Sequence, residues 1–301
     1  FYHSGPGNPG QFDWAAISAY NAPDIIEAQW QSLLTELHDN AGPRDTIPID
    51  IIGFSRGAAL ARHFGNVIDE HVNQGYFSYT DPSRGLITAC VDLRFMGLFD
   101  TVAQFGLLGM QNANYDLTIA SAWEWVAHAV ALQERRWLFP LTSAAGGTGR
   151  NTVEAPFIGA HSDIGGGLAF DDAGNVSSRG DLSDVALNWM LWQARAAALR
   201  FGEIDPADRE ITEPILHDQS AALVRSSQKG DRRIDAPDGS ILNNQQNDHA
   251  RLGRQQRAAT ERLITRGDNW QHSIAIEVGV VDMAGYAQWL HDELGWQAIP
   301  A

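Results

Sequence analysis

Hydrophobic and polar residues follow one another along this chain in patterns that separate helices from strands. Apolar side chains recur every three or four residues over 23–39 and 183–199, and the second stretch begins with a serine suited to cap a helix. The same spacing predicts further helices at 56–70, 119–134 and 284–296. Short apolar runs predict strands at 47–53, 86–92, 94–99 and 155–160. Because strands alternate with helices, we expect an α/β fold whose mostly parallel sheet is covered by helices on both faces.

Two stretches break this alternation. Residues 102–118 are apolar and rich in glycine, leucine and asparagine, whereas residues 218–260 carry the many Asp, Gln, Asn and Arg side chains typical of loops. We expect a core over residues 1–220 and a C-terminal extension over residues 221–301. In the extension, a loop-like segment leads to a terminal helix that packs on the core.

Composition narrows the classes of partner. Of the 301 residues 44% are hydrophobic and 19% are charged, as expected for a soluble globular protein, and no apolar run reaches the ~18 residues of a spanning helix. The net charge of −16, without a stripe of Lys and Arg, argues against nucleic-acid binding and against electrostatic recruitment to anionic membranes. Contact with a membrane surface would therefore rely on apolar side chains. No signal peptide is recognisable, which favours a cytoplasmic location in the producing cell. Because the first residue, Phe1, is not a methionine, we expect a fragment or a processed form. The lone cysteine, Cys90, excludes an internal disulfide, and its apolar neighbours predict a buried strand position.

The first candidate for chemistry is a serine at the corner between a strand and a helix. Residues 53–57 read Gly-Phe-Ser-Arg-Gly, a G-x-S-x-G motif that follows an apolar run and precedes an alanine-rich helical pattern. This is the context of a nucleophile elbow, in which Ser55 projects from the sheet and the Arg56 N–H faces a developing oxyanion. Side chains at Gly53 and Gly57 would collide with the neighbouring strand and helix in so tight a turn. The alternative is a strand-to-helix turn that contains glycine and serine without any catalytic role.

A serine hydroxyl needs a base and an orienting acid before it can attack a carbonyl. The order Ser, Asp, His allows two sets, Ser55–Asp163–His217 and Ser55–Asp100–His161. Topology favours the first set, because Asp163 leaves the second strand after the elbow and His217 lies on a loop beyond the next helix. In the second set, the histidine would still be near the end of a strand, where both partners are hard to reach. The alternatives without catalysis are a core-edge role for His161 and a turn-capping role for Asp100.

A second oxyanion donor is expected before the elbow, in the turn at residues 5–7. Pro6 has no N–H, so Gly7 is the better donor. The same segment, GPGNPG, matches the dinucleotide pattern G-x-G-x-x-G, but its prolines rigidify the turn and no long strand precedes it. We therefore expect neither a nucleotide cofactor nor a metal ion.

Taken together, these motifs resemble a known family. Four blocks occur in the family's order: GFSRGAALAR, GLFDTVAQFG, VAHAVALQERRWLFP and FIGAHSDIGGG. Over residues 1–220 the chain resembles a bacterial and fungal family of α/β-hydrolase domains that includes type VI secretion lipase effectors of the first phospholipase group. Family members usually carry an F-D-G-T block ahead of the first residue here, so the first strand of the sheet is expected upstream. Beyond residue 220 no family resemblance is found.

The resemblance implies a phospholipase A that cleaves acyl esters of glycerophospholipids and is delivered by type VI secretion into the periplasm of rival bacteria. It supports Ser55, Asp163 and His217 as the matching catalytic positions. The partners it implies are a component of the secretion apparatus and an immunity or inhibitor protein. Two alternatives remain open, a general carboxylesterase acting on small or neutral esters and a non-catalytic binding module with the same fold. The apolar segment 102–118 is either part of an acyl-chain wall or lid, or ordinary core.

Overall fold

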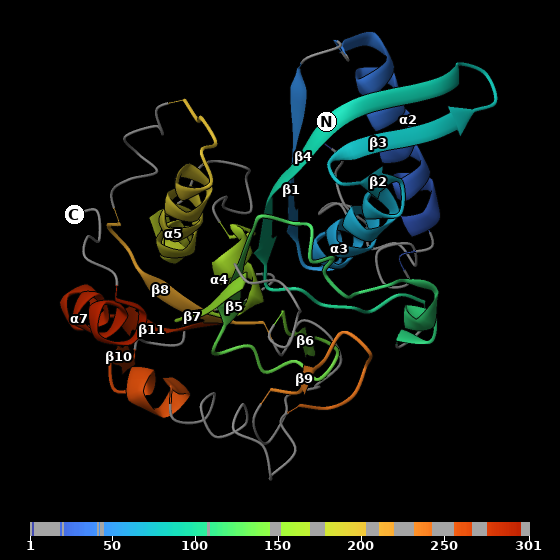
Figure 1. Ribbon diagram of the computed structural model, residues 1–301. Coiled ribbons are helices and arrows are strands. Elements are labelled where there is room, and N and C mark those ends of the chain that lie inside the picture. The colour runs from blue at the N-terminus through green and yellow to red at the C-terminus, as the bar shows by residue number, and fades with distance from the viewer. Residues whose placement is uncertain are drawn as a thin grey trace. The chain divides into compact units, whose positions relative to one another are not determined.

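The computed structural model describes most of the chain, with gaps at both ends and in several loops. The described residues are 2, 19, 21–40, 42, 45–106, 109–144, 152–168, 178–202, 211–219, 232–242, 256–266 and 276–295. The chain forms two compact units, one made of Phe1–Ala127 and Ala144–Val153 and the other of His128–Ser143 and Glu154–Ala301. Both units combine helices with strands, so the predicted α/β class is confirmed (Figure 1). The predicted division at residue 220 stays a prediction.

The first unit has a mixed sheet with helices packed against it. Its elements are α2 (Ala22–Asn40), β1 (Thr46–Phe54), α3 (Arg56–Asp69), β2 (Val72–Asn73), β3 (Tyr76–Asp81), β4 (Gly85–Phe99), η2 (Asn112–Asn114) and the start of β5 (Trp125–Ala131). β1 pairs with β4 in parallel, as expected, whereas β2, β3 and β4 are antiparallel neighbours. Figure 1 shows β3 and β4 as a long teal ribbon with α2 alongside. The predicted helices at 23–39 and 56–70 and the strand at 47–53 are confirmed.

β4 is a single strand where the sequence predicts two. Its register against β1 shifts by one residue, because Ile49 faces Leu93 and Asp50 faces Phe95. The extra residue, Arg94, forms a β-bulge, and its Nε lies 2.9 Å from Asp50 Oδ1. The bulge switches the phase of the strand, so the core side chains come from odd-numbered positions before it and even-numbered positions after it. They are Ile87, Ala89, Val91, Leu93, Met96 and Leu98.

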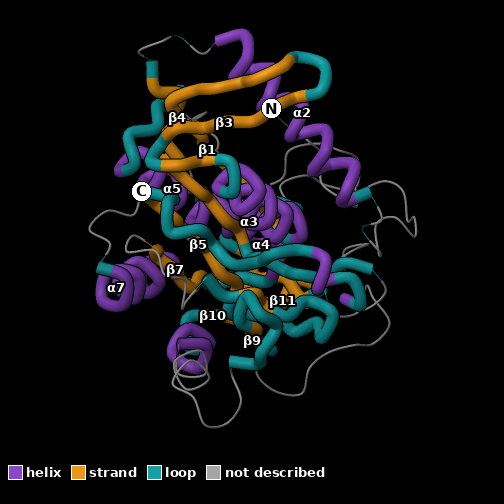
Figure 2. The backbone as a smooth tube through the Cα atoms, turned by 45° about the vertical axis from the view of Figure 1, so that its right-hand side comes forward, coloured by secondary structure: helices purple, strands orange, loops and turns teal. Residues whose placement is uncertain are grey.

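The core of the first unit lies between this sheet and its two helices, which Figure 2 shows beside β1 and β4. Leu34 and Leu37 of α2 are fully buried, and Ala58 and Ile68 come from α3. Replacing either leucine with alanine would cost roughly 2–5 kcal/mol, because the cavity left behind refills only partly. These helices therefore hold the strand that carries the predicted elbow.

The apolar segment 102–118 belongs partly to a second core cluster of the first unit. Ala103, Phe105 and Leu117 are buried in it, and the rings of Phe105 and Tyr115 lie 4.1 Å apart. Core packing therefore accounts for these positions, whereas Met110 is 79% exposed. Residues 107–108 lie outside the described part of the chain.

The second unit contains a small antiparallel sheet together with helices, among them a short described helix at residues 256–261. Its elements are the rest of β5, β6 (Leu141–Thr142), most of β7 (Thr152–Phe157), α4 (His161–Gly165), η3 (Ser178–Gly180), α5 (Leu182–Ala196), β8 (Ile215–Asp218), β9 (Ile234–Asp235), β10 (Ile264–Arg266), β11 (Ile276–Val281) and α7 (Met283–Leu294). β10, β11 and β8 form the antiparallel sheet, and β6 pairs with β9 in parallel. The predicted helices at 183–199 and 284–296 are confirmed as α5 and α7.

Two predictions about local structure are wrong. The helix predicted at 119–134 is a strand, β5, in which every side chain from Val126 to Ala131 is buried. Such a run has no polar face, so its periodicity cannot separate a helix from a strand. Cys90 is exposed rather than buried, because it lies between two core residues on a strand and its side chain points to the opposite face. None of the described helices is long and apolar enough to cross a bilayer.

Candidate functional site

Ser55 occupies a strained corner between β1 and α3. Its backbone angles are φ 59° and ψ −125°, a region that a serine rarely adopts and that costs on the order of 1–3 kcal/mol. The Ser55 N–H donates to Phe99 O at 2.9 Å, which ties the corner to the end of β4. Its side chain makes no capping hydrogen bond to α3. This backbone strain at a serine is typical of a nucleophile elbow.

The two glycines of the motif differ in their surroundings. A Cβ at Gly53 would lie 2.5 Å from Gly57 O and 2.7 Å from Ala58 Cα, so the predicted collision is confirmed there. The same prediction is wrong for Gly57, because a Cβ at that position would meet nothing within 4 Å among the described atoms outside its own helix backbone. Of the two motif positions, only the one at the end of the strand, Gly53, therefore requires glycine for a steric reason.

Arg56 is the first residue of α3, where backbone N–H groups have no acceptor within the helix. Burial of the guanidinium lowers the pKa of Arg56 below its ordinary value. The predicted donor Gly7 lies outside the described residues.

Asp100 follows β4 directly, and it is fully buried with φ 42°. β1 and β4 are parallel, with Phe54 opposite Phe99, so Ser55 and Asp100 leave the sheet at the same edge of the first unit. The Val102 N–H then donates to Ser55 O at 3.3 Å. In parallel α/β sheets this carboxyl-end edge is where ligands bind.

The second unit brings Asp163 and His217 together. Asp163 lies in the first turn of α4, which starts four residues after β7 ends, and His217 lies on β8. His217 Nδ1 is 2.7 Å from Asp163 Oδ1, and both side chains are 1% exposed. The other carboxylate oxygen, Oδ2, accepts the N–H of His217 at 3.0 Å and the N–H of Ala160 at 3.0 Å. A carboxylate held in this way fixes the orientation of an imidazole, as in serine hydrolases.

The predicted loop position of His217 is wrong. The residue belongs to strand β8, opposite Glu277 of β11, and its backbone is therefore held by the sheet. Only four residues long, β8 is flanked by Glu213 and Pro214 on one side and by polar residues on the other, so sequence pattern alone does not reveal it.

His161 is the first residue of α4 and is 4% exposed. Its ring packs edge-on against Phe139 at 4.9 Å, and its N–H donates to Glu134 Oε2 at 3.1 Å. Of the predicted residues, Ser55, Arg56 and Asp100 belong to the first unit, and His161, Asp163 and His217 belong to the second.

Sequence reasoning missed the side chains that hold the turn before Asp163. Gln133, Glu134 and Tyr286 each accept a backbone N–H of residues 158–161. No sequence signal marks them, because these contacts join residues 26 to 128 positions apart.

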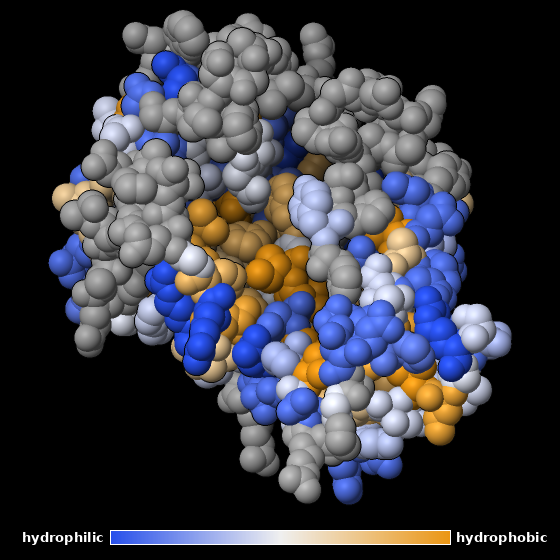
Figure 3. Space-filling model, turned by 90° about the horizontal axis from the view of Figure 1, so that it is seen from above, coloured by the Kyte–Doolittle hydropathy of each residue, from blue (hydrophilic) through white to orange (hydrophobic). Residues whose placement is uncertain are grey.

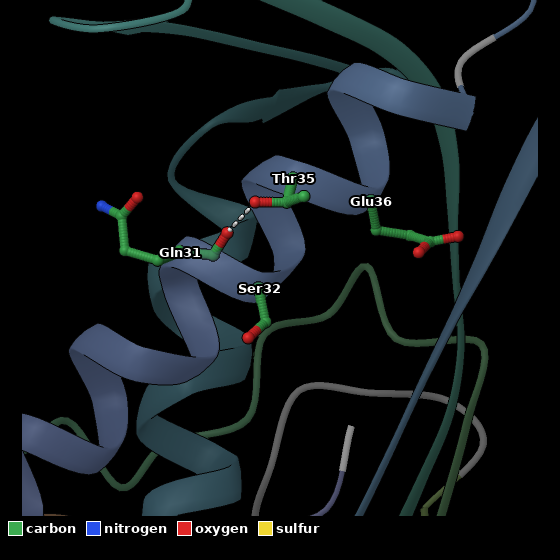
Figure 4. Close-up of a pocket in the computed structure, with 4 residues that line it drawn as sticks. All are labelled: Gln31, Ser32, Thr35 and Glu36. Atoms are coloured by element: carbon green, nitrogen blue, oxygen red, sulfur yellow. Dashed lines mark hydrogen bonds between the residues drawn. The ribbon is translucent and has the colours of Figure 1, made fainter.

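A shallow depression on α2 is a separate feature of the first unit. Figure 4 shows Gln31, Ser32, Thr35 and Glu36 around it, with the Thr35 hydroxyl donating to Gln31 O at 2.8 Å. These side chains offer neither a nucleophile–base pair nor a cluster of metal ligands. Elsewhere in the described part of the chain, too, no group of three or more His, Cys, Asp or Glu side chains is placed to hold a metal ion.

Comparison with known proteins bears on residues 78–193. This stretch matches the model of the family described as "T6SS, Phospholipase effector Tle1-like, catalytic domain". Over these residues, the resemblance to that family is confirmed. The matched Tle1-like stretch includes Asp100, His161 and Asp163, whereas Ser55 and His217 lie outside it.

The solved structures that are similar to parts of the chain include the following two. One is an uncharacterized protein from Pseudomonas aeruginosa, with 26% identity, a TM-score of 0.42, and coverage of 66% of this chain and 31% of that one. The other is described as the Tle1 effector bound to the VgrG spike from the type 6 secretion system, with 20% identity, a TM-score of 0.43, and coverage of 66% and 56%. The chain thus spans less than two thirds of either protein. No curated protein matches it.

Proposed function

We propose that this chain is a serine-dependent lipolytic hydrolase of the α/β-hydrolase type, a phospholipase A that acts as a type VI secretion effector. The observation that carries the proposal is the buried Asp163–His217 pair, with its 2.7 Å contact, within a chain that matches a Tle1-like catalytic domain over residues 78–193. The strained backbone of Ser55, at the end of a parallel strand, supports it.

In the proposed mechanism, His217 takes the proton of the Ser55 hydroxyl as the serine oxygen attacks an acyl carbonyl. Asp163 keeps the imidazole in the required tautomer and stabilises its charged form. The Arg56 N–H and a second donor, assigned to Gly7, stabilise the tetrahedral oxyanion by roughly 3 kcal/mol each. Water activated by the same histidine then hydrolyses the acyl-enzyme. The alternative partners Asp100 and His161 are assigned no proton transfer.

The proposed substrate requires contact with lipid. Apolar side chains that are at least half exposed occur in both units and include Ile52, Leu86, Met110 and Trp192. Figure 3 shows hydrophobic residues, in orange, gathered among hydrophilic ones on one face. Because the net charge of −16 disfavours attraction to anionic lipids, we propose that the chain contacts the membrane through such apolar side chains.

Partners and location follow from the Tle1-like match as further proposals. We propose that a component of the secretion apparatus carries this chain into the periplasm of a target cell, where phospholipid is accessible. The producing cell then needs an immunity protein.

A fluorophosphonate probe, which labels activated serines, tests the catalytic assignment. The unmodified chain should be labelled, and Ser55→Ala should abolish labelling and lower ester hydrolysis by at least about 10⁴-fold. His217→Ala should suppress labelling although Ser55 is intact. Ser78→Ala, which changes an exposed serine of β3, is the matched control and should be labelled normally. Equal labelling of the Ser55→Ala variant would refute the assignment.

Substrate class requires a separate assay. Vesicles of a glycerophospholipid labelled separately at each acyl chain should lose one labelled fatty acid faster than the other. If the chain hydrolyses short soluble esters but releases nothing from vesicles, it is a general carboxylesterase. If it hydrolyses neither, it is a non-catalytic module.

A further inference from the structure

Four consecutive backbone N–H groups, from the residue after β7 to the first residue of α4, each donate to a different side chain. We call this stretch, residues 158–161, the β7–α4 turn. The acceptors, in chain order from Ile158 to His161, are Tyr286 Oη (2.9 Å), Gln133 Oε1 (2.8 Å), Asp163 Oδ2 (3.0 Å) and Glu134 Oε2 (3.1 Å). All four residues of the turn are buried, so their N–H groups need partners within the protein. The path of this backbone is therefore set by side chains from other elements.

The backbone of the turn lies in close steric contact with Asp163. Gly159 has φ +146°, and a Cβ there would lie 2.8 Å from Asp163 Cβ and 3.0 Å from Ile164 Cδ1. The Asp163 carboxylate also accepts the Ala160 N–H, so the backbone of the turn and the Asp163 side chain cannot move independently. Any shift of the turn is passed to the carboxylate that contacts His217.

Gln133 holds the turn at two points. Its backbone N–H donates to Gly159 O at 2.9 Å, and its side-chain oxygen accepts the Gly159 N–H at 2.8 Å. Its Nε2 donates to Thr260 Oγ1 at 3.0 Å, and the Thr260 hydroxyl donates to Arg257 O. Thr260, in the C-terminal part of the chain, therefore orients the Gln133 side-chain amide, and this amide holds the turn at Gly159.

Tyr286 brings the last helix to the same turn. The residue is fully buried on α7, and burial raises the pKa of its phenol well above the ordinary value, so the hydroxyl stays neutral. Its oxygen accepts the Ile158 N–H, the first of the four. α7 itself starts at a firm N-cap, where Asp282 accepts the N–H groups of Ala284 and Gly285.

Glu134 completes the set from the β5 side. Its carboxylate makes a bidentate pair with Arg136, at 2.9 Å and 2.7 Å, and also accepts the Arg136 N–H. Burial would raise the pKa of Glu134, but the hydrogen bond from Arg136 and the charges of Arg136, Arg232 and His161 outweigh it and lower the pKa overall. Glu134 thus remains a charged acceptor for the His161 N–H.

We infer that Tyr286 and Gln133 are positioning residues, which act through the β7–α4 turn to hold the Asp163 carboxylate in line with His217. This inference rests on the proposed function. It assigns the C-terminal helix α7 a part in catalysis without any contact with substrate. A displacement of about 1 Å at a catalytic group can cost on the order of 100-fold in rate, so loss of one clamp should be visible in turnover.

Tyr286→Phe is the first test, because it removes one oxygen and keeps the ring. The variant should lower kcat for ester hydrolysis roughly ten-fold or more, with KM unchanged, once active sites are counted by fluorophosphonate titration. Tyr79→Phe, which removes a hydroxyl from β3 in the other unit, is the matched control and should leave kcat unchanged. An unchanged kcat in Tyr286→Phe would overturn the inference.

A double-mutant cycle separates positioning from loss of stability. In an Asp163→Asn background, Tyr286→Phe should have no further effect on kcat, because the carboxylate through which it acts is already altered. Equal fold losses in both backgrounds would mean that Tyr286 acts elsewhere, and the inference would fail. Gln133→Met should repeat the loss, whereas Gln133→Glu, which keeps the acceptor for the Gly159 N–H and loses the donor to Thr260, should lose less of kcat. This pair keeps the test decisive if Tyr286→Phe does not fold.

One readout is independent of activity. A proton between His217 Nδ1 and Asp163 Oδ1 should give a far-downfield ¹H resonance, which is absent in His217→Gln. Tyr286→Phe should shift or broaden this resonance and Tyr79→Phe should not. If the unmodified chain hydrolyses no ester, the proposed function fails, and the resonance still decides whether Tyr286 positions Asp163. An unaffected resonance in Tyr286→Phe refutes the positioning role whatever the activity.

Discussion

The two glycines of the elbow provide the sharpest test of the structure, because they are chemically identical and should respond in opposite ways to the same substitution. Gly53→Ala adds a methyl group 2.5 Å from Gly57 O, 2.7 Å from Gly57 C and 2.7 Å from Ala58 Cα. All three contacts are with backbone atoms, so no side-chain rotation relieves them. Either β1 or the first turn of α3 has to move.

The expected magnitudes follow from these surroundings. Overpacking against rigid neighbours costs about 1–3 kcal/mol, and a backbone clash should fall at or above the top of that range. Gly57 instead lies in the first turn of α3 with a helical backbone and open space. Alanine is favoured over glycine in a helix by about 1 kcal/mol at interior positions, and by less near the end. The two variants should thus differ in free energy of unfolding by roughly 3–4 kcal/mol.

Urea denaturation followed by tryptophan fluorescence measures both variants against the unmodified chain. Gly53→Ala should lower the midpoint clearly, whereas Gly57→Ala should leave it unchanged or raise it slightly. Equal loss in both variants would mean that the motif needs two glycines for a steric reason absent from this structure. A stable Gly53→Ala variant would refute the elbow geometry itself.

Three further predictions concern single side chains. Asp163→Asn should lower kcat for ester hydrolysis on the order of 10³–10⁴-fold, and Asp100→Asn by far less, in parallel assays normalised to folded protein; the opposite ranking would favour the alternative triad. Arg94→Met should lower the free energy of unfolding by at most about 1 kcal/mol, measured by urea denaturation, and by less at high salt. The reason is that solvent reaches the ion pair with Asp50, whose side chains are both about a quarter exposed. A larger loss would mean that the ion pair holds the bulge. The pKa of Asp81 lies below its ordinary value, chiefly because a serine hydroxyl two residues on donates to it. The stabilising effect of Asp81 is therefore present above the unfolded pKa and lost as pH falls through the folded pKa. Asp81→Asn should destabilise the chain at about pH 7 and progressively less as the pH is lowered; a loss independent of pH would contradict this.

The elements that sequence predicts well are those with a one-sided apolar pattern. α2 buries Leu34 and Leu37 and exposes the opposite face, so its spacing identifies it. β5 fails for the opposite reason, because burial on all sides removes the pattern. Whether a strand residue is buried depends on which face of the strand it occupies as well as on its neighbours in sequence, since Cys90 has apolar neighbours and is nevertheless exposed.

The β2–β3 hairpin was missed although its signal is in the sequence. Asn73 faces Tyr76, so the loop has only two residues, Gln74 and Gly75, and both have positive φ. Two positive φ values are the mark of the tight hairpin turn that a residue followed by glycine favours. The β3–β4 connection likewise ends in Gly85 at φ +81°. Turn residues, rather than apolar runs, carried this information.

In the candidate site, too, the features that depend on adjacent residues could be predicted, and those that depend on contacts between distant residues could not. The corner at Ser55 could be predicted, because a strand, a glycine and a helix start are adjacent in sequence. The Asp163–His217 contact joins residues 54 positions apart, and chain order only narrowed the choice of partners. The strand position of His217 could not be found locally, since β8 exists through its pairing with β11 at residues 276–281.

That pairing changes how the C-terminal residues should be regarded. From sequence, residues 221–301 are an extension beyond the resemblance to a known family. In the structure they supply β11, which pairs with the strand that carries His217, and α7, whose Tyr286 holds the turn before Asp163. Both members of the buried pair are therefore held in part by residues that no motif identifies. Because the orientation of a carboxylate toward an imidazole depends on fractions of an ångström, these C-terminal elements belong to the physical basis of the site as much as the sequence motifs do.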